Sequence, residues 1–261
     1  ALFLLLTAGV VGGGVQRGIE RWSKILMPLL LLILLGLIIF SMTLEGASKG
    51  VEFYLKPDLS KISGSTILAA VGQAFFSLSL GMGTMITYGS YISKRENLAV
   101  SAASVAVADT VIAVLAGLVI FPALFSVGQA PAQGPALVFN VLPEIFQRMP
   151  GGTLVGALFF VLLAIAALTS TVSLLEVPVA FLVDQRKWPR KKAVLIVTAV
   201  VFLVGIPSAL SQGTVRALSS MAWAGGKGFL DTMDFLFGNL SLSIGGLLLA
   251  VLVGWVWGTR K

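Results

Sequence analysis

Seven long apolar stretches, separated by short polar segments, dominate the pattern of the chain. A helix that crosses a bilayer needs about 20 consecutive and mostly apolar residues, and these stretches reach or approach that length. They predict helices near residues 1–15, 23–42, 66–92, 97–125, 153–183, 190–210 and 230–257. The pattern therefore predicts an all-α fold, a polytopic bundle of membrane helices that forms a single transmembrane domain over residues 1–261.

The third stretch differs from the others because small and polar residues crowd its middle. Ser77, Ser79, Gly81 and Gly83 fall within residues 71–91. Gly weakens a helix and Ser competes for its backbone hydrogen bonds, so a discontinuous helix is expected here. In hydrocarbon, an opened turn must be buried in protein or line a wet cavity, where its polar backbone groups can bind a zwitterion or a small cation. A continuous helix whose small residues allow close packing is the alternative, and these residues alone do not decide between the two.

Composition agrees with a membrane protein and removes several kinds of chemistry. The 261 residues are 57% hydrophobic and 11% charged, with a mean hydropathy of +1.00. Because the chain has no Cys and no His, disulfides, thiolate or imidazole catalysts and metal sites built on those residues are excluded. Gly81-Met-Gly83 lacks the third Gly of a dinucleotide fingerprint, and no phosphate loop or nucleophile elbow occurs. We therefore expect no enzyme and no catalytic residues.

The net charge of +7 reflects basic residues that fall into two alternating sets of loops. The first set holds twelve: Arg17, Arg21, Lys24, Lys94, Arg95, Arg186, Lys187, Arg190, Lys191, Lys192, Arg260 and Lys261. The second set holds six: Lys49, Lys56, Lys61, Arg148, Arg216 and Lys227. Cytoplasmic loops carry an excess of Lys and Arg, so the first set is predicted to be cytoplasmic. Topology thus explains the positive charge, and no nucleic-acid partner is expected.

Two acidic residues lie inside apolar stretches. Asp109 interrupts the stretch 97–125, and an ionisable group within a membrane indicates a functional site, with Na⁺ or a proton as its plausible partner. A solvated residue that lines a crevice near a helix end is the alternative. Glu176, which stands just before Pro178, is a weaker candidate and is expected in a water-filled cytoplasmic passage.

A group of small and hydroxyl-bearing residues follows a helical period in the fifth stretch. Ala166, Thr169, Ser170 and Ser173 recur at i, i+3, i+4 and i+7, so they share one face of the predicted helix. Hydroxyl and carbonyl oxygens are hard ligands that an alkali cation accepts. Hydrogen bonding between helices is the alternative, and the spacing alone favours it.

Three further features mark the ends of the predicted helices. Pro28 removes one helix hydrogen bond and Gly18 weakens the turn before it, so the cytoplasmic end of this helix is predicted to unwind; a fixed kink is the alternative. Asp184 and Asp234 are expected either as halves of ion pairs that open and close or as solvated helix ends. Residues 43–65, which mix acids with Lys, predict a solvated external loop.

Three strings of residues, in this order and spacing, carry a resemblance to a known family. They are Gly18-Ile-Glu-Arg-Trp-Ser-Lys-Ile-Leu-Met-Pro28, Gly72-Gln-Ala-Phe-Phe-Ser-Leu-Ser-Leu-Gly-Met-Gly83 and Leu168-Thr-Ser170. Together they resemble the neurotransmitter:sodium symporter family, in particular its bacterial amino-acid members with the leucine-transporter fold. The chain looks like helices four to ten of that inverted-repeat fold, whose broken helices form a site at the membrane midplane. With its start inside an apolar stretch, this leads us to expect a piece of a longer transporter.

The resemblance implies a sodium-coupled secondary active symporter that carries neutral or hydrophobic amino acids by alternating access. Its partners would be a hydrophobic or aromatic L-amino acid, Na⁺ at two sites, and the lipid bilayer of the cell (plasma or inner) membrane, crossed several times. No organic cofactor is expected. Proton coupling through Asp109 and Glu176 is the alternative within transport, and a channel or a non-transporting membrane protein is the alternative outside it.

The resemblance also implies roles for individual residues. The substrate pocket would be lined by Phe76, Ser77, Ser79, Gly81, Met82, Ser170 and Leu174. One sodium would be bound by Ser77 and Asp109, and the second by Ala166, Thr169 and Ser170. Asp234 and Asp184 would be the external and internal gate acids, with Tyr91 bracing the internal pair. Gly18 and Pro28 would bracket the hinge at which the helix unwinds.

Asp109 differs from the Asn usual at this position of the family. The resemblance implies that chloride-dependent relatives hold chloride beside the first sodium, near Gln73, Ser77 and a Ser one turn after that Asn. Here the later position is Ala113, which has neither a hydroxyl nor a charge. We hypothesise that the Asp109 carboxylate supplies the negative charge itself, which would make transport chloride-independent.

Overall fold

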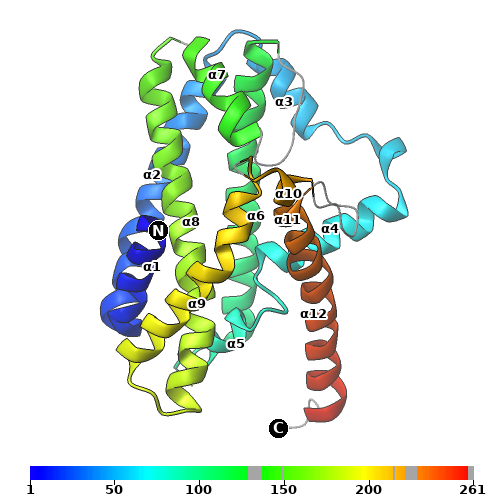
Figure 1. The fold of residues 1–261 in the computed structure, drawn as a ribbon. Helices are drawn as coiled ribbons and strands as arrows, with labels where there is room; N and C mark the ends of the chain where they lie inside the picture. The colour runs from blue at the N-terminus through cyan, green and yellow to red at the C-terminus, as the bar shows by residue number, and fades with distance from the viewer. Residues whose placement is uncertain (94, 129–136, 149, 214, 221–227, 258–261) are drawn as a thin grey trace. The chain divides into compact units, whose positions relative to one another are not determined.

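A computed structural model describes residues 1–93, 95–128, 137–148, 150–213, 215–220 and 228–257 of the chain. These residues form helices and the turns between them, without a β-strand (Figure 1). The α-helices are α1 (Leu2–Gly12), α2 (Arg21–Met42), α3 (Ala47–Leu55), α4 (Gly64–Ser77), α5 (Thr84–Gly89), α6 (Leu98–Ser126), α7 (Leu142–Arg148), α8 (Gly152–Asp184), α9 (Arg190–Leu210), α10 (Arg216–Ser219), α11 (Phe229–Met233) and α12 (Ser241–Val251).

Shorter helical turns complete the described part of the chain. A 3₁₀ turn, η2, covers Leu59–Lys61. Four π-helical segments are η1 (Val15–Glu20), η3 (Leu137–Val141), η4 (Asp234–Leu240) and η5 (Leu252–Trp257). Four of the basic residues in the topology argument, Lys94, Lys227, Arg260 and Lys261, lie outside the described residues.

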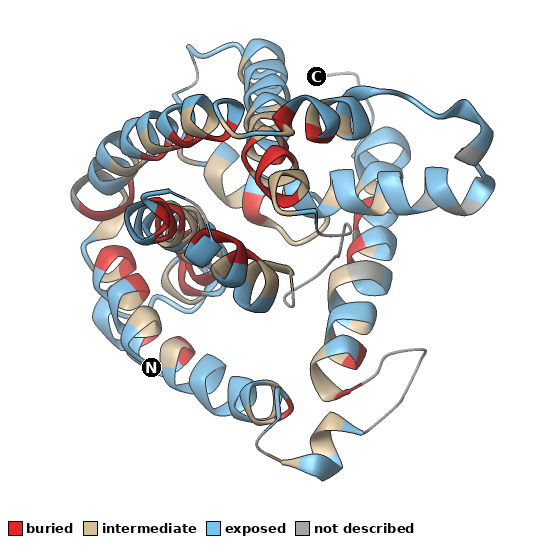
Figure 2. Ribbon diagram, turned by 90° about the horizontal axis from the view of Figure 1, so that it is seen from above, coloured by how far each residue is buried: buried red, intermediate tan, exposed pale blue. Residues whose placement is uncertain are grey.

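Five helical runs within the described residues are long and apolar enough to cross a membrane. They are Gly18–Met42, Leu98–Ser126, Gly152–Asp184, Arg190–Leu210 and Phe229–Trp257, and α1 is a shorter apolar helix. Figure 2 shows pale blue, exposed residues on most turns of the long helices and buried residues in narrow strips. Helices that are apolar on nearly every side suit contact with lipid. The predicted all-α, polytopic fold is confirmed.

The third apolar stretch forms two helices rather than one, which confirms the predicted discontinuity. The first of them, α4, starts with a capping box, because the Ser63 hydroxyl accepts a hydrogen bond from the amide of Thr66 and the Thr66 hydroxyl accepts one from the amide of Ser63. It ends at Ser77, and α5 begins at Thr84. Residues 78–83 between the two helices are not helical.

The chain divides into two compact units. Unit 1 comprises Ala1–Ile19, Lys61–Asn97 and Thr171–Lys261, and unit 2 comprises Glu20–Ser60 and Leu98–Ser170. The helix α8 is continuous and contributes its first part to unit 2 and its second part to unit 1. The single transmembrane domain over residues 1–261 stays a prediction.

Unit 2 contains a buried apolar cluster, which α2, α6, α7 and the first part of α8 build together. Its fully buried members include Leu34, Leu124, Leu142 and Ile145. The Ser41 hydroxyl donates a buried hydrogen bond of 2.8 Å to the carbonyl of Val119, which ties α2 to α6. These contacts fix the helix that carries Asp109 and the start of the helix that carries Ala166.

The loop predicted over residues 43–65 is wrong in part, because it contains α3. This helix packs on α6 through aromatic side chains: the rings of Tyr54 and Phe121 stack at 4.8 Å, and Phe53 lies 5.2 Å from Phe125, centroid to centroid. Contact between aromatic rings in this way stabilises a short helix that would be marginal alone.

In unit 1, pairs of helices pack against each other. The helix α1 packs against α9, and α4 packs against α12. The hydroxyl groups of Thr7 and Thr171 lie 2.9 Å apart, so α1 is also tied to the second part of α8. Unit 1 therefore contains the break, the end of α8 and the start of α9 in one packed body.

Candidate functional site

The break in the third stretch begins with an ordered helix end. The amide of Leu80 donates to the carbonyl of Phe75 at 2.9 Å, and the amide of Ser79 donates to that of Phe76 at 3.0 Å. This pair of bonds is the Schellman arrangement, in which one residue after the helix adopts the left-handed conformation. That residue is Ser79, with φ 54°. A side chain in this conformation costs about 1 kcal/mol, so surrounding contacts must hold the break open.

Those contacts come from α12, which packs backbone to backbone against the break. Gly81 has φ +82°, and a Cβ placed on it would lie 2.4 Å from the carbonyl oxygen of Leu242 and 2.8 Å from the amide nitrogen of Gly246. Only glycine fits both the conformation and the space. The opened backbone is thus built into the packing of unit 1.

The break gathers five of the seven predicted substrate residues into one short stretch of unit 1. Phe76 and Ser77 end α4 and are exposed, whereas Ser79, Gly81 and Met82 follow in the break and are half-buried. The 14-residue helix α4 presents its carbonyl end here, and that end of a helix favours a positive charge such as an ammonium group.

The other two predicted substrate residues lie on α8, on either side of the boundary between the units. Leu174 belongs to unit 1 and is 50% exposed. Ser170 belongs to unit 2, so its place beside the break stays a prediction.

Three predicted cation ligands meet on the first part of α8. The carbonyl oxygen of Ala166 accepts hydrogen bonds from the hydroxyl groups of Thr169 at 2.9 Å and Ser170 at 3.2 Å. Three neutral oxygens are therefore held close together on one face, as the spacing predicted. The described residues contain no cluster of three or more Asp or Glu side chains that could hold a metal. The three predicted ligands are a backbone carbonyl and two hydroxyl groups, all of them neutral oxygens.

Asp109 is half-buried on α6 in unit 2, within the membrane-spanning run Leu98–Ser126. Ser77, its predicted partner in the first sodium site, belongs to unit 1. The pairing of these two residues around one ion stays a prediction.

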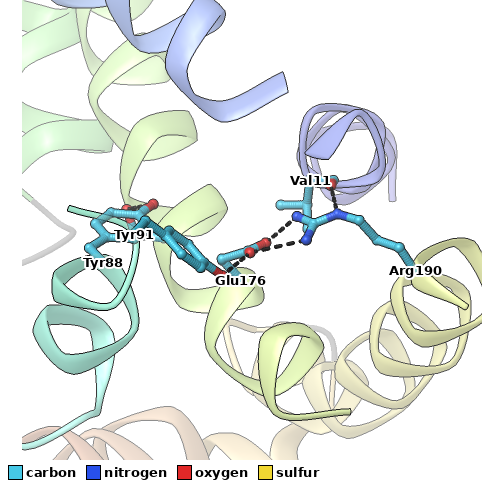
Figure 3. Close-up of polar contacts among 6 residues, drawn as sticks. Val11, Tyr88, Tyr91, Glu176 and Arg190 are labelled. Atoms are coloured by element: carbon cyan, nitrogen blue, oxygen red, sulfur yellow. Dashed lines mark hydrogen bonds and ion pairs between the residues drawn. The ribbon is translucent and has the colours of Figure 1, made fainter. Parts of the chain in front are cut away.

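A network of charged and polar groups joins the end of α8 to the start of α9 (Figure 3). Glu176 is fully buried, and its carboxylate receives two bonds from the guanidinium of Arg190, at 2.5 and 3.2 Å. The Tyr91 hydroxyl donates to the same carboxylate at 2.6 Å. Arg190 also donates through Nε to the carbonyl of Val11 at 2.9 Å, which adds α1 to the network.

This geometry corrects the expectation that Glu176 lines a water-filled passage. The carboxylate is enclosed by protein and matched by a bidentate guanidinium, the strongest kind of hydrogen-bonded ion pair. Arg190 was not predicted as a functional residue, because the sequence shows it only as one of several basic residues in a loop that is predicted to be cytoplasmic. The one available indication was that a buried Glu176 requires a cationic partner.

The predicted gate acids lie at helix ends. Asp184 is the exposed last residue of α8, and Asp234 is the exposed first residue of η4. Tyr91 lies two residues beyond α5, and its bond goes to Glu176. Gly18 lies within the π-helical turn η1, and Pro28 lies inside α2. The gating and hinge roles of these residues stay predictions.

The sequence is similar to known proteins over nearly its whole length. The family model described as the Sodium:neurotransmitter symporter family matches residues 1–261. The sodium-dependent transporter YhdH of Bacillus subtilis is 42% identical over 252 residues, which cover 97% of this chain and 55% of YhdH. A sodium-dependent transporter of Haemophilus influenzae is 40% identical over 256 residues, with 98% and 55% covered. The chain thus spans about half the length of these curated relatives.

A solved structure shares the fold. The crystal structure of MhsT in complex with L-phenylalanine is 48% identical in sequence and has a TM-score of 0.89. The match covers 99% of this chain and 58% of that chain. The identity and the coverage show that the likeness extends over nearly every helix described above.

Proposed function

Because the chain belongs to the sodium:neurotransmitter symporter family, we propose that the protein is a sodium-coupled secondary active symporter of neutral, hydrophobic amino acids. Its relatives are sodium-dependent transporters, so sodium dependence is the family property. The amino-acid substrate is proposed from the likeness to MhsT, whose structure contains L-phenylalanine. The protein would cross the plasma or inner membrane several times and work by alternating access.

The broken helix is the observation that carries this proposal. Its carbonyl end suits the ammonium group of an amino acid, and the opened backbone supplies polar groups that an intact helix would use internally. Phe76, Met82 and Leu174 offer apolar surface for a hydrophobic side chain. A symporter needs such a site, whereas a simple pore has no use for a conformation that costs stability.

From the family and the oxygen ligands described above, we also propose two sodium sites. The oxygens of Ala166, Thr169 and Ser170 would hold one ion. Ser77 and Asp109 would contribute to the other, with the Asp109 carboxylate taking the place of chloride. Sodium and substrate would favour each other's binding because both select the same arrangement of the helices.

Proton coupling through Glu176 is disfavoured by the network. Its carboxylate accepts bonds from Tyr91 and Arg190 and lies away from solvent. Breaking such a pair is costly, so Glu176 suits a lasting structural contact better than a site that takes up a proton in each cycle.

Binding of radiolabelled L-leucine and L-tryptophan to the full-length gene product tests the proposal. We expect saturable binding in NaCl, loss of binding when K⁺ replaces Na⁺, and unchanged binding when gluconate replaces chloride. Equal binding in Na⁺ and K⁺ would exclude sodium coupling. Uptake into Na⁺-free vesicles driven by a pH gradient would favour the proton-coupled alternative instead.

A further inference from the structure

Two tyrosines at the end of the broken helix bind the same helix, α8 (Figure 3). The Tyr88 hydroxyl donates to the Ser173 hydroxyl at 2.9 Å, and the Tyr91 hydroxyl donates to Glu176 at 2.6 Å. Both partners are 85 residues away in sequence, so the two bonds keep a common register. They connect the half-helix that follows the break directly to α8.

The two bonds end at different kinds of acceptor. Glu176 is already held by Arg190 from α9, so the place of its carboxylate is fixed independently of the rest of α8. Ser173 instead lies one turn after Thr169 and Ser170, at i+4 and i+3, on the face that carries the candidate cation ligands. The Tyr88 bond is therefore a contact between the half-helix α5, which follows the break, and the face of α8 that carries the candidate cation ligands.

We infer that the hydrogen bond between Tyr88 and Ser173 couples the two ligand sites, which makes both residues positioning residues for transport. This inference rests on the proposed function. A cation bound by Ala166, Thr169 and Ser170 fixes that turn of α8, and the next turn carries Ser173. Ser173 in turn fixes Tyr88, four residues after the start of α5. The half-helix is then held in the arrangement that the amino acid needs at residues 78–83.

Coupling of this kind is measured as a ratio of affinities. If sodium and substrate select one arrangement, the dissociation constant of the substrate falls from low to saturating Na⁺ by a coupling factor. Removal of one neutral hydrogen bond should reduce that factor about fivefold, which corresponds to ~1 kcal/mol. Because the bond is lost when either hydroxyl is removed, the double change should reduce the factor no further than the larger of the two single changes.

The experiment measures the dissociation constant of tritiated L-leucine for the full-length gene product at low and at saturating Na⁺, with K⁺ as the replacement ion. We compare Tyr88→Phe, Ser173→Ala and the double variant with the wild type. Tyr54→Phe is the matched control, because it removes a tyrosine hydroxyl whose bond to the carbonyl of Ala113 is 3.5 Å long and which lies outside this contact. Its coupling factor should equal that of the wild type.

The outcomes separate this inference from the proposed function. A coupling factor that is unchanged in Tyr88→Phe and in Ser173→Ala overturns the inference while sodium-coupled binding stands, as does a double variant whose loss is the sum of the two. A wild type without any effect of Na⁺ on leucine binding overturns the proposed function and this inference with it. If Tyr88→Phe does not fold, Ser173→Ala alone decides, since it removes only one oxygen atom.

Discussion

Glu176 and Arg190 form an ion pair, but they differ in burial. We therefore predict that replacing Arg190 lowers the free energy of unfolding more than replacing Glu176. The Glu176 side chain is fully buried, whereas that of Arg190 is 24% exposed. Arg190→Gln leaves a buried carboxylate without its cation, which costs about 3–5 kcal/mol, and it removes the bond to Val11, worth about 1 kcal/mol. Glu176→Gln leaves an arginine whose side chain is partly exposed and whose Nε keeps its bond to Val11, so we expect a cost of about 1–3 kcal/mol.

The assay is the free energy of unfolding of the full-length gene product in mixed micelles, titrated with sodium dodecyl sulfate. Arg190→Gln should be the more damaging single change. The double variant should cost less than the sum of both, because loss of Arg190 leaves no buried charge once Glu176 is neutral. Lys24→Gln is the control: it breaks an exposed pair with Glu20 and should cost less than about 1 kcal/mol.

Two results would refute this reasoning. Equal costs for Arg190→Gln and Glu176→Gln would mean that burial does not distinguish the two partners. Additive costs in the double variant would mean that the two side chains do not interact in the folded protein, whatever their distance.

Three further changes test the break, the first sodium site and the hinge. Gly81→Ala should cost at least about 2 kcal/mol in unfolding free energy, because its Cβ would collide with the Leu242 carbonyl at a positive φ. Gly72→Ala is the control that should be tolerated, because the space around its Cβ is open. Equal stability of the two variants would contradict the packing argument. Asp109→Asn should weaken the dependence of uptake on Na⁺ or introduce a requirement for chloride, and unchanged uptake in gluconate buffer with unchanged Na⁺ affinity would count against it. Pro28→Ala restores a hydrogen bond to α2 and should slow release of Na⁺ into vesicles with little change in external binding, whereas equal release rates would dispose of the hinge.

The break could be predicted because the residues that weaken a helix are the same ones that an opened backbone requires. Gly81 and Gly83 both have φ of +82°, a conformation that glycine adopts without cost. The sequence alone could not distinguish a break in the helix from close packing between helices, because the same residues serve both. Gly81 lies in the open stretch and also lets α12 approach, and that second fact depends on a helix distant in sequence.

The polar network shows the opposite case. Arg190 is one of five basic residues between 186 and 192, and nothing in the local pattern separates it from its neighbours. Arg190 differs from these neighbours because it begins α9, at a place where its guanidinium contacts Glu176 and Val11 near the end of α1. Three separate segments create that environment, so no local property of the sequence reveals it. The same reason hides α3, which depends on contact between Tyr54 and Phe121.

Gly18 illustrates how a packing requirement can imitate a hinge. In the folded chain, η1 returns over the end of α1, and a Cβ on Gly18 would lie 2.0 Å from the carbonyl oxygen of Val10. Glycine is therefore required at this position whether or not the helix ever unwinds, and Gly18→Ala would damage the fold before it tested any motion. Pro28 is different, since its replacement by Ala removes atoms and adds a hydrogen bond donor. The hinge hypothesis thus depends on Pro28, and Gly18 supports only the close approach of two segments.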